Sequence, residues 1–320
     1  MTIADSLSVP SESAAMDVDV ECVPSTSDVR LDDLPAEVLV RIFRDLDLDS
    51  ILKAREVNGY LLSVAHFLLA TKPSLNIAEE YQTEESPALR WNKLCSFSKF
   101  YMPSIEELSF RGANAHLSLS ELIQVSWAFP SIISLDISQN EDKLPKVDPD
   151  VLFAVPYFKR LQTLKISGLY PMHTVRRGCG NRGEIAFVSQ LSAVRRLEMD
   201  APDRWLRAIK ERDARFSSLL EISFDLFKSP PEIFVDLAWF IDAHGNLEEI
   251  TLSGALFASN AQIEQIMRSL CHCSHLKRVT LNNCTCVDIV RQCAEEVTLR
   301  TRVVVNGIVT SLRFDPSRMQ

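Results

Sequence analysis

The chain has 320 residues, of which 46% are hydrophobic and 24% charged, and its formal net charge is −9. This length and composition predict one elongated domain or two compact ones with a sizeable core. The negative charge argues against a nucleic-acid backbone or an anionic membrane as the main partner. Eight cysteines without a recognisable signal peptide favour free thiols in a reducing compartment, so we expect a cytoplasmic or nuclear protein.

The first thirty residues form a Ser-rich tail without aromatic residues. They include six acidic residues and one basic residue, which predicts a disordered segment over 1–30. The serines and threonine of "PSTSD" (24–28) are candidate phosphorylation sites, with an unregulated tail as the alternative.

Three short helices are predicted over residues 31–70. Pro35 suits a first helical position, and acidic residues before and after it suit the positive end of the helix dipole. Asp47 and Asp49 offer a cap for a second helix, and a third apolar stretch begins at Val57. The apolar stripe of the first helix consists of Val38, Leu39, Ile42, Phe43 and Leu46. So small a unit is marginally stable alone, so we expect it to dock on a partner.

A repeat dominates residues 105–306. Seven segments follow the pattern apolar-x-x-apolar-x-apolar, at spacings of 25 to 33 residues. Their central apolar residues are Leu108, Leu135, Leu164, Leu197, Ile222, Ile250 and Val279. Helical patterns lie between them, for example at 121–129, 234–242 and 262–270. A short strand followed by a helix at this period predicts a solenoid, because each unit buries its apolar face only by stacking on its neighbours.

This pattern resembles the leucine-rich repeat family. Asn140 and Cys284 stand where the family places Asn or Cys after the strand, and Cys273 before the last strand is typical of the cysteine-containing subtype. The resemblance implies an α/β solenoid of about seven units, with a parallel sheet on the concave face and helices outside. We expect a linker or cap at 71–104, closure of the array by Val303–Val305, and a C-terminal cap or tail at 307–320.

Residues 31–70 resemble an F-box, whose pattern begins Leu-Pro-x-Glu-apolar-apolar. The segment departs from that pattern at Leu48, Gly59, Tyr60 and Leu61. The resemblance implies docking on a Skp-family adaptor, and through it on a cullin–RING ubiquitin ligase, with the repeats selecting a protein substrate. The implied adaptor contacts are Leu34, Pro35, Leu39, Ile42, Phe43, Leu46, Ile51, Leu52 and Val57.

The outward positions of the repeat strands predict the substrate surface. From Arg196 to Glu249 this row is predominantly acidic, so we expect a basic or mixed-charge protein segment there; a merely solvated sheet face is the alternative. The candidate residues are Asp136, Lys165, Arg196, Glu198, Asp200, Glu221, Asp225 and Glu249.

Other motifs carry less weight. "GCGNRG" (178–183) fits a dinucleotide fingerprint, but it does not follow a strand directly, so a basic loop over 173–183 is the better interpretation. Cys271, Cys273, Cys284 and Cys286 are spaced i, i+2 in pairs, which favours buried thiols over zinc. No catalytic arrangement is apparent, and we expect no cofactor or metal. The sequence therefore favours a non-catalytic substrate receptor of a ubiquitin ligase, with a non-degradative repeat scaffold as the alternative and a nucleotide-dependent enzyme as a third, weaker hypothesis.

Overall fold

The computed structural model describes residues 30–80, 87–112, 117–138, 149–167, 193–285 and 302–308. Its centre is one parallel sheet in which nine strands follow one another in chain order. The strands are β1 (Ser74–Asn76), β2 (Glu107–Ser109), β3 (Ser134–Asp136), β4 (Thr163–Ile166), β5 (Arg196–Asp200), β6 (Glu221–Asp225), β7 (Glu249–Ser253), β8 (Arg278–Cys284) and β9 (Arg302–Ile308). Strictly sequential parallel order confirms an α/β repeat solenoid.

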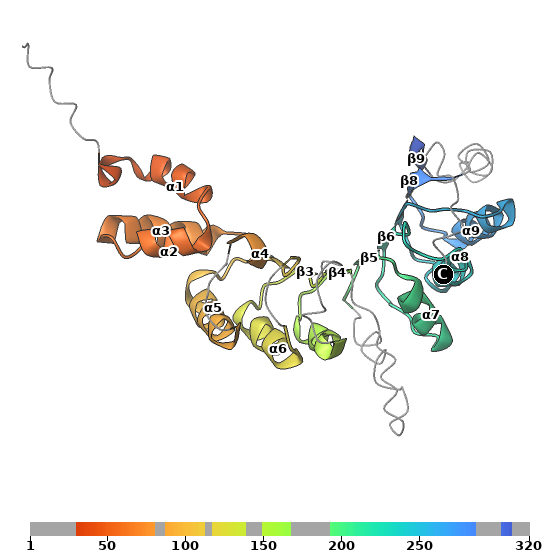
Figure 1. Ribbon diagram of the computed structural model, residues 1–320, viewed down its shortest axis with the longest axis horizontal. Helices are drawn as coiled ribbons and strands as arrows, with labels where there is room; N and C mark the ends of the chain where they lie inside the picture. Colours follow the sequence, from red (N-terminus) through yellow and green to blue (C-terminus); the bar gives the residue numbers. More distant parts are fainter. Residues whose placement is uncertain are drawn as a thin grey trace, which may run out of the picture.

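Helices cover one side of this sheet, and the strands form an arc above them, with the N-terminal helices at one end (Figure 1). The array helices are α5 (Pro87–Tyr101), α6 (Leu119–Ala128), the 3-10 helix η2 (Pro149–Tyr157), α7 (Asp203–Glu211), α8 (Ile233–Ala243) and α9 (Asn260–His272). The other helices are the 3-10 turn η1 (Leu31–Asp33), α1 (Ala36–Arg44), α2 (Leu48–Ala54), α3 (Gly59–Thr71) and α4 (Ile77–Glu80). None of the helices in the described ranges is long and apolar enough to cross a membrane.

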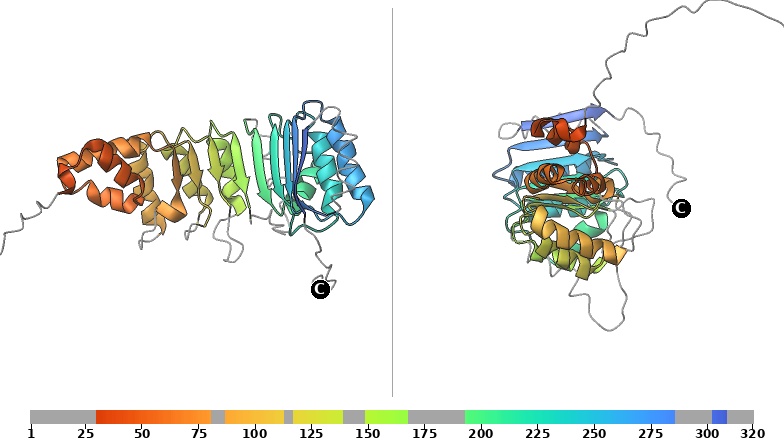
Figure 2. Two further views of the ribbon diagram at one scale, coloured as in Figure 1. Left: turned by 90° about the horizontal axis from the view of Figure 1, so that it is seen from above. Right: turned by 90° about the vertical axis from the view of Figure 1, so that its left-hand side faces the viewer.

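The strand register matches the sequence repeat residue by residue. Leu108 lies opposite Leu135, Leu135 opposite Leu164, and Leu164 opposite Leu197. The alignment continues through Ile222 and Ile250 to Val279. All seven central residues are buried, because each stacks on its counterpart in the next unit. The seven predicted segments are therefore the seven strands β2 to β8, which lie side by side in Figure 2.

The sheet is longer than the sequence pattern indicated. Ser74–Asn76 in the segment 71–104 pairs with β2, and Arg302–Ile308 pairs with β8 and crosses the boundary placed at 306. Leu75 and Val303 take the central position in these two strands. The first position of the pattern holds Lys72 and Arg300, whereas each inner unit has an apolar residue there. A terminal strand has a neighbouring strand on one side only, so its pattern can be incomplete.

The turn after several strands requires an unusual backbone conformation. Ala201, Gly254 and Asn283 each follow the last outward residue of a strand, with φ of 46°, 66° and 51°. At Gly254 a Cβ atom would lie 2.8 Å from the Cβ of Phe227, so glycine is needed there for both conformation and space. Cys284, at the predicted consensus position, is buried at the end of β8, whereas Asn140 lies outside the described residues.

The N-terminal helices form a small unit joined to the array through α3 and α5. Asp47 caps α2 by accepting a hydrogen bond from the Ser50 N–H at 2.6 Å. At the junction with α5, the Arg55 guanidinium lies 5.3 Å from the ring centre of Phe97 and 5.1 Å from that of Tyr101. This cation–π contact ties α2 to the first helix of the array.

Candidate interaction surfaces

Three of the nine residues expected to contact an adaptor are buried in the core of the protein itself. Leu39, Phe43 and Ile51 have exposed fractions of 0%, 1% and 2%. They pack in the same hydrophobic core as buried residues of α3, including Leu61 and Leu69. Their role is to hold the three helices together, so they cannot form an outer contact surface while the unit stays folded.

Two apolar residues of α1 are exposed on its outer flank. Val38 and Ile42, four residues apart, are 39% and 38% exposed, and Pro35 is exposed before them. Leu46, two residues beyond the end of α1, is half-buried and packs against the core, as does Leu34. Within α1, the spacing of four residues places Val38 and Ile42 on one side of the helix. Val38 belonged to the predicted helical stripe but not to the predicted contacts, and its exposure adds it to this surface.

A groove of about 510 Å³ separates α1 from α3 on the other flank of α1. One end is tied together by the Tyr60 hydroxyl, which donates to the Leu34 carbonyl at 3.0 Å. Phe67, 58% exposed, lines the groove further along α3. The lining consists of Ala36, Glu37, Val40, Arg41 and Arg44 from α1 and Tyr60, Ser63, Val64 and Phe67 from α3. Val38 and Ile42 do not line this groove, so α1 presents two different faces.

The two remaining predicted contacts lie on α2 and beyond its end. Leu52 is half-buried and lines a second groove, of about 990 Å³, between α2 and α5. Val57 is 68% exposed in the turn before α3 and lines neither groove. Leu52 and Val57 are thus separated from the α1 flank, and the nine predicted residues do not form one surface.

The outward positions of the strands form three rows across the concave face of the sheet. The register places Thr163, Arg196, Glu221, Glu249 and Arg278 in the first row. The second row contains Asp136, Lys165, Glu198, Ser223 and Thr251. The third row contains Asp200, Asp225, Ser253 and Asn282. All eight predicted concave residues lie in these rows.

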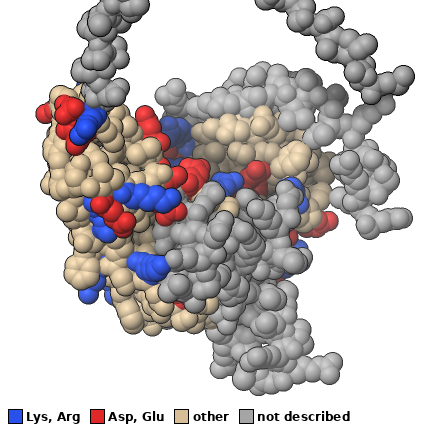
Figure 3. All heavy atoms as spheres, turned by 60° about the vertical axis from the view of Figure 1, so that its left-hand side comes forward, with Lys and Arg blue, Asp and Glu red and all other residues tan. Residues whose placement is uncertain are grey.

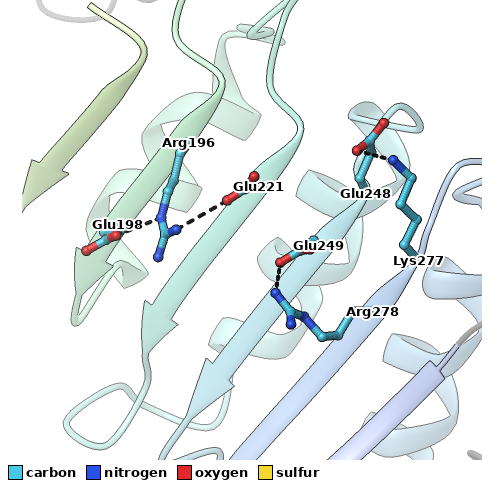
Figure 4. A network of polar contacts seen from close by, with 7 residues as sticks. All are labelled: Arg196, Glu198, Glu221, Glu248, Glu249, Lys277 and Arg278. Atoms are coloured by element: carbon cyan, nitrogen blue, oxygen red, sulfur yellow. Dashed lines mark hydrogen bonds and ion pairs between the residues drawn. The ribbon is translucent and has the colours of Figure 1, made fainter. Parts of the chain in front are cut away.

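Most of the predicted acidic cluster is neutralised within the chain. Arg196 lies between two carboxylates, with its Nε 2.7 Å from Glu198 Oε1 and its Nη1 3.3 Å from Glu221 Oε2 (Figure 4). Lys165 Nζ is 3.3 Å from the other oxygen of Glu198. Arg278 is paired with Glu249 in the same row. Basic and acidic side chains likewise lie next to one another on the face shown in Figure 3. The acidic character expected from the sequence is therefore local rather than general.

Three of the predicted concave carboxylates have no cationic partner within the described residues. Asp136 Oδ1 accepts the Ser138 N–H at 2.9 Å, and Asp225 Oδ1 accepts the Phe227 N–H at 3.0 Å. Asp200 lies directly opposite Asp225 in the third row. Like charges facing each other on adjacent strands repel, so this pair is the part of the face that favours a cationic partner.

A buried histidine holds the array together between α8 and the segment before β6. His244 Nε2 accepts the Phe216 N–H at 3.0 Å, and Nδ1 lies 2.7 Å from the Phe240 carbonyl, to which it donates. Burial lowers the pKa of His244, and the charge of Arg215 lowers it further, against a raising effect of the bond to Phe240. The imidazole is therefore neutral, and its role is structural.

The cysteines that the structure describes are free thiols. Burial raises the pKa of Cys95 and of Cys273 to about 11, which disfavours the thiolate form. Within the described ranges, no three His, Cys, Asp or Glu residues are grouped so that they could hold a metal ion. The basic loop 173–183 with its glycine motif lies outside the described residues, as do Cys286 and Cys293.

Comparisons with known proteins identify no family for this chain. No protein-family model matches the chain, and no curated protein matches its sequence. Among solved structures, the chain is similar to a Bacteroides fragilis protein whose crystal structure comes from a structural genomics consortium. That similarity has a TM-score of 0.43 at 13% identity and covers 88% of this chain and 74% of the other.

Proposed function

We propose that the protein is the substrate-recognition subunit of an SCF-type ubiquitin ligase, in which the N-terminal helices dock on a Skp-family adaptor and the repeats bind the target. The observation that carries this proposal is the exposed apolar flank of α1. Val38 and Ile42 are exposed on one side of α1, with Pro35 just before the helix and Leu46 just after it, whereas Leu39 and Phe43 are buried. An apolar stripe at this spacing is the form in which a helix presents itself to a partner.

The resemblance of residues 31–70 to an F-box supports the choice of partner. The structure-based contact set differs from the one the resemblance implies, because Leu39, Phe43 and Ile51 are buried. Docking is proposed through Pro35, Val38, Ile42 and Leu46, with Leu34 at the edge. The protein itself carries out no chemistry in this proposal: it holds the target's lysines near a ubiquitin carrier, which raises their effective concentration.

The concave face is the proposed substrate surface, centred on Asp200 and Asp225. A partner lysine or arginine there would relieve the repulsion between the two carboxylates. Asp200→Lys combined with Asp225→Asn tests this, since the asparagine keeps an oxygen for the Phe227 N–H. Proteins recovered with the full chain under proteasome inhibition should lose the cationic partner in this variant but not in Glu211→Lys, on the exposed end of α7. Retention of every partner would contradict the assignment.

Adaptor docking is tested by changing exposed residues only. Val38→Asp with Ile42→Asp should weaken binding of a purified Skp-family adaptor by at least about tenfold. The reason is that docking would no longer bury two apolar side chains away from water. Val235→Asp is the matched control, since Val235 is 49% exposed on α8. Equal adaptor binding by all three chains would refute this docking face.

The scaffold alternative predicts a different result from the same variants. If the protein is an adaptor-bound scaffold that does not promote degradation, the adaptor should co-purify without a cullin. Ubiquitination of bound partners should then be the same with and without the Val38 and Ile42 changes. Loss of both cullin and ubiquitination in that double variant favours the ligase.

A further inference from the structure

The groove between α1 and α3 has an apolar floor and a basic rim. Val40 and Val64 contribute to the floor, and the partly exposed Phe67 borders it. Arg41 and Arg44 are exposed on α1 and have no ion-pair partner within the described residues. Glu37 also lines the groove, so the rim carries two positive charges and one negative charge. An occupant that matches this groove needs apolar side chains on one side and carboxylates on the other.

The chain contains such a segment, separated by seven residues from its first described residue. Residues 16–22 read "MDVDVEC", in which apolar and acidic residues alternate strictly. In an extended conformation, alternation of period two places Met16, Val18 and Val20 on one side and the three acidic residues on the other. The acidic residues are Asp17, Asp19 and Glu21.

The position of this segment in the chain allows it to reach the groove. Residues 23–29 separate it from Arg30, where the described structure begins next to η1 and the tied end of the groove. Seven residues span up to about 23 to 25 Å when extended. Helix α1, with nine residues, is about 13.5 Å long. The connection is therefore long enough for the segment to lie along α1.

We propose that residues 16–22 dock in the groove between α1 and α3 of the same chain, with Val18 and Val20 on the apolar floor and carboxylates of Asp17, Asp19 and Glu21 paired with Arg41 and Arg44. Attachment to α1 gives the segment a millimolar effective concentration, so docking in cis needs only modest intrinsic affinity. The inference does not depend on the adaptor proposal, because Val38 and Ile42 lie outside this groove.

The test uses the full chain and a fluorescein-labelled synthetic peptide of residues 13–24 with Cys22→Ser. A tail-reversed chain carries Asp17→Lys, Asp19→Lys and Glu21→Lys, which removes the competing segment while leaving the groove intact. Fluorescence anisotropy should show that this chain binds the peptide at least about tenfold more tightly than the natural chain, whose own tail competes.

Groove variants complete the design. Arg41→Glu with Arg44→Glu in the tail-reversed chain should abolish peptide binding. A peptide with the same three lysines should bind a chain that carries these two groove changes and keeps the natural acidic tail, because that tail no longer competes for the groove. Arg160→Glu with Arg195→Glu is the matched control, because both side chains are exposed and lie outside the groove. Circular dichroism melts should be equal among these chains, since every changed residue in the described part is on the surface.

Three results would overturn the proposal. Equal peptide binding by the tail-reversed chain with and without Arg41→Glu and Arg44→Glu would show that the groove does not accept the segment. Equal peptide binding by the natural and tail-reversed chains would show that the groove is open in the natural chain. A concentration-dependent dimer that disappears with Arg41→Glu and Arg44→Glu would assign the groove to a second copy of the protein.

Discussion

The N-terminal helices and the repeat array bury their apolar residues to different extents. Residues 31–71 contain six of the eleven large hydrophobic side chains that are exposed within the described ranges, whereas the much longer repeat array contains the other five, Phe100, Trp127, Tyr157, Phe227 and Val235. In the array each unit stacks on two neighbours, and strand register brings apolar residues together. Helices α1 to α3 share a core but leave the α1 flank and the α1–α3 groove open. For their length, the N-terminal helices therefore expose more large apolar side chains than the array does.

The largest expected effect is the difference in stability between variants at a buried and at an exposed position of α1. Phe43→Ala should lower the free energy of unfolding by about 3 to 5 kcal/mol, because Phe43 is 1% exposed in the core of the helical unit. Ile42→Ala should change it by no more than about 0.5 kcal/mol, since Ile42 is 38% exposed. Urea denaturation of both variants measures this difference. Equal effects would mean that the two faces of α1 are not distinct.

A second, smaller effect tests the rigidity of the array turns. Gly254→Ala should destabilise the protein by at least about 2 kcal/mol, because it combines a positive φ with a clash against Phe227. Gly245→Ala is the matched control: its nearest neighbour would be the His272 carbonyl at 4.0 Å, and its φ is not positive. Thermal unfolding should separate the two variants. If Gly254→Ala were as stable as Gly245→Ala, the turn would not constrain the stacking of units.

The smallest effect concerns the pH dependence of the array. The pKa of His244 is lowered from 6.5 in the folded protein, so the unfolded chain binds a proton first as the pH falls. Its contribution to stability is complete above about pH 6.5 and is lost as the pH falls toward the folded pKa, by up to about 1.4 kcal/mol per pH unit.

Denaturation between pH 7.5 and 5.5 measures this slope. His244→Gln should flatten it, whereas His275→Gln, an exposed position outside the core, should leave it unchanged. An identical slope in the natural chain and the His244→Gln variant would contradict the buried, neutral histidine.

Local sequence patterns predicted the inner strands well, because a buried strand in a repeat must place apolar residues at fixed positions. Leu108 to Val279 were identified for this reason, and the register confirms them. The strand at Leu75 was not identified because Lys72 occupies the first apolar position of its unit. The cap of α2 at Asp47 was also predicted, since an N-cap depends only on residues three apart.

The contact surfaces could not be predicted to the same degree. The apolar stripe of α1 contains Val38, Leu39, Ile42 and Phe43, and it is wide enough to face both the protein core and a partner. The sequence alone does not show which half of the stripe is buried. The burial of Leu39 and Phe43 follows from the packing of α1 on α3. On the concave face, the negative charges of Glu198 and Glu221 could be predicted from the sequence. Their pairing with Arg196 became clear only from the strand register of the structure.

The sequence by itself determined the repeat, the parallel order of the inner strands and the alternation of inward and outward residues, because these depend on spacing along the chain. Only the tertiary structure decided which apolar residues of α1 stay exposed and which carboxylates of the sheet stay without a cation. Those outcomes depend on neighbours far apart in the sequence, such as Arg196 and Glu221 on adjacent strands. Burial and charge pairing are set by the three-dimensional arrangement of the chain, and periodicity alone does not contain that information.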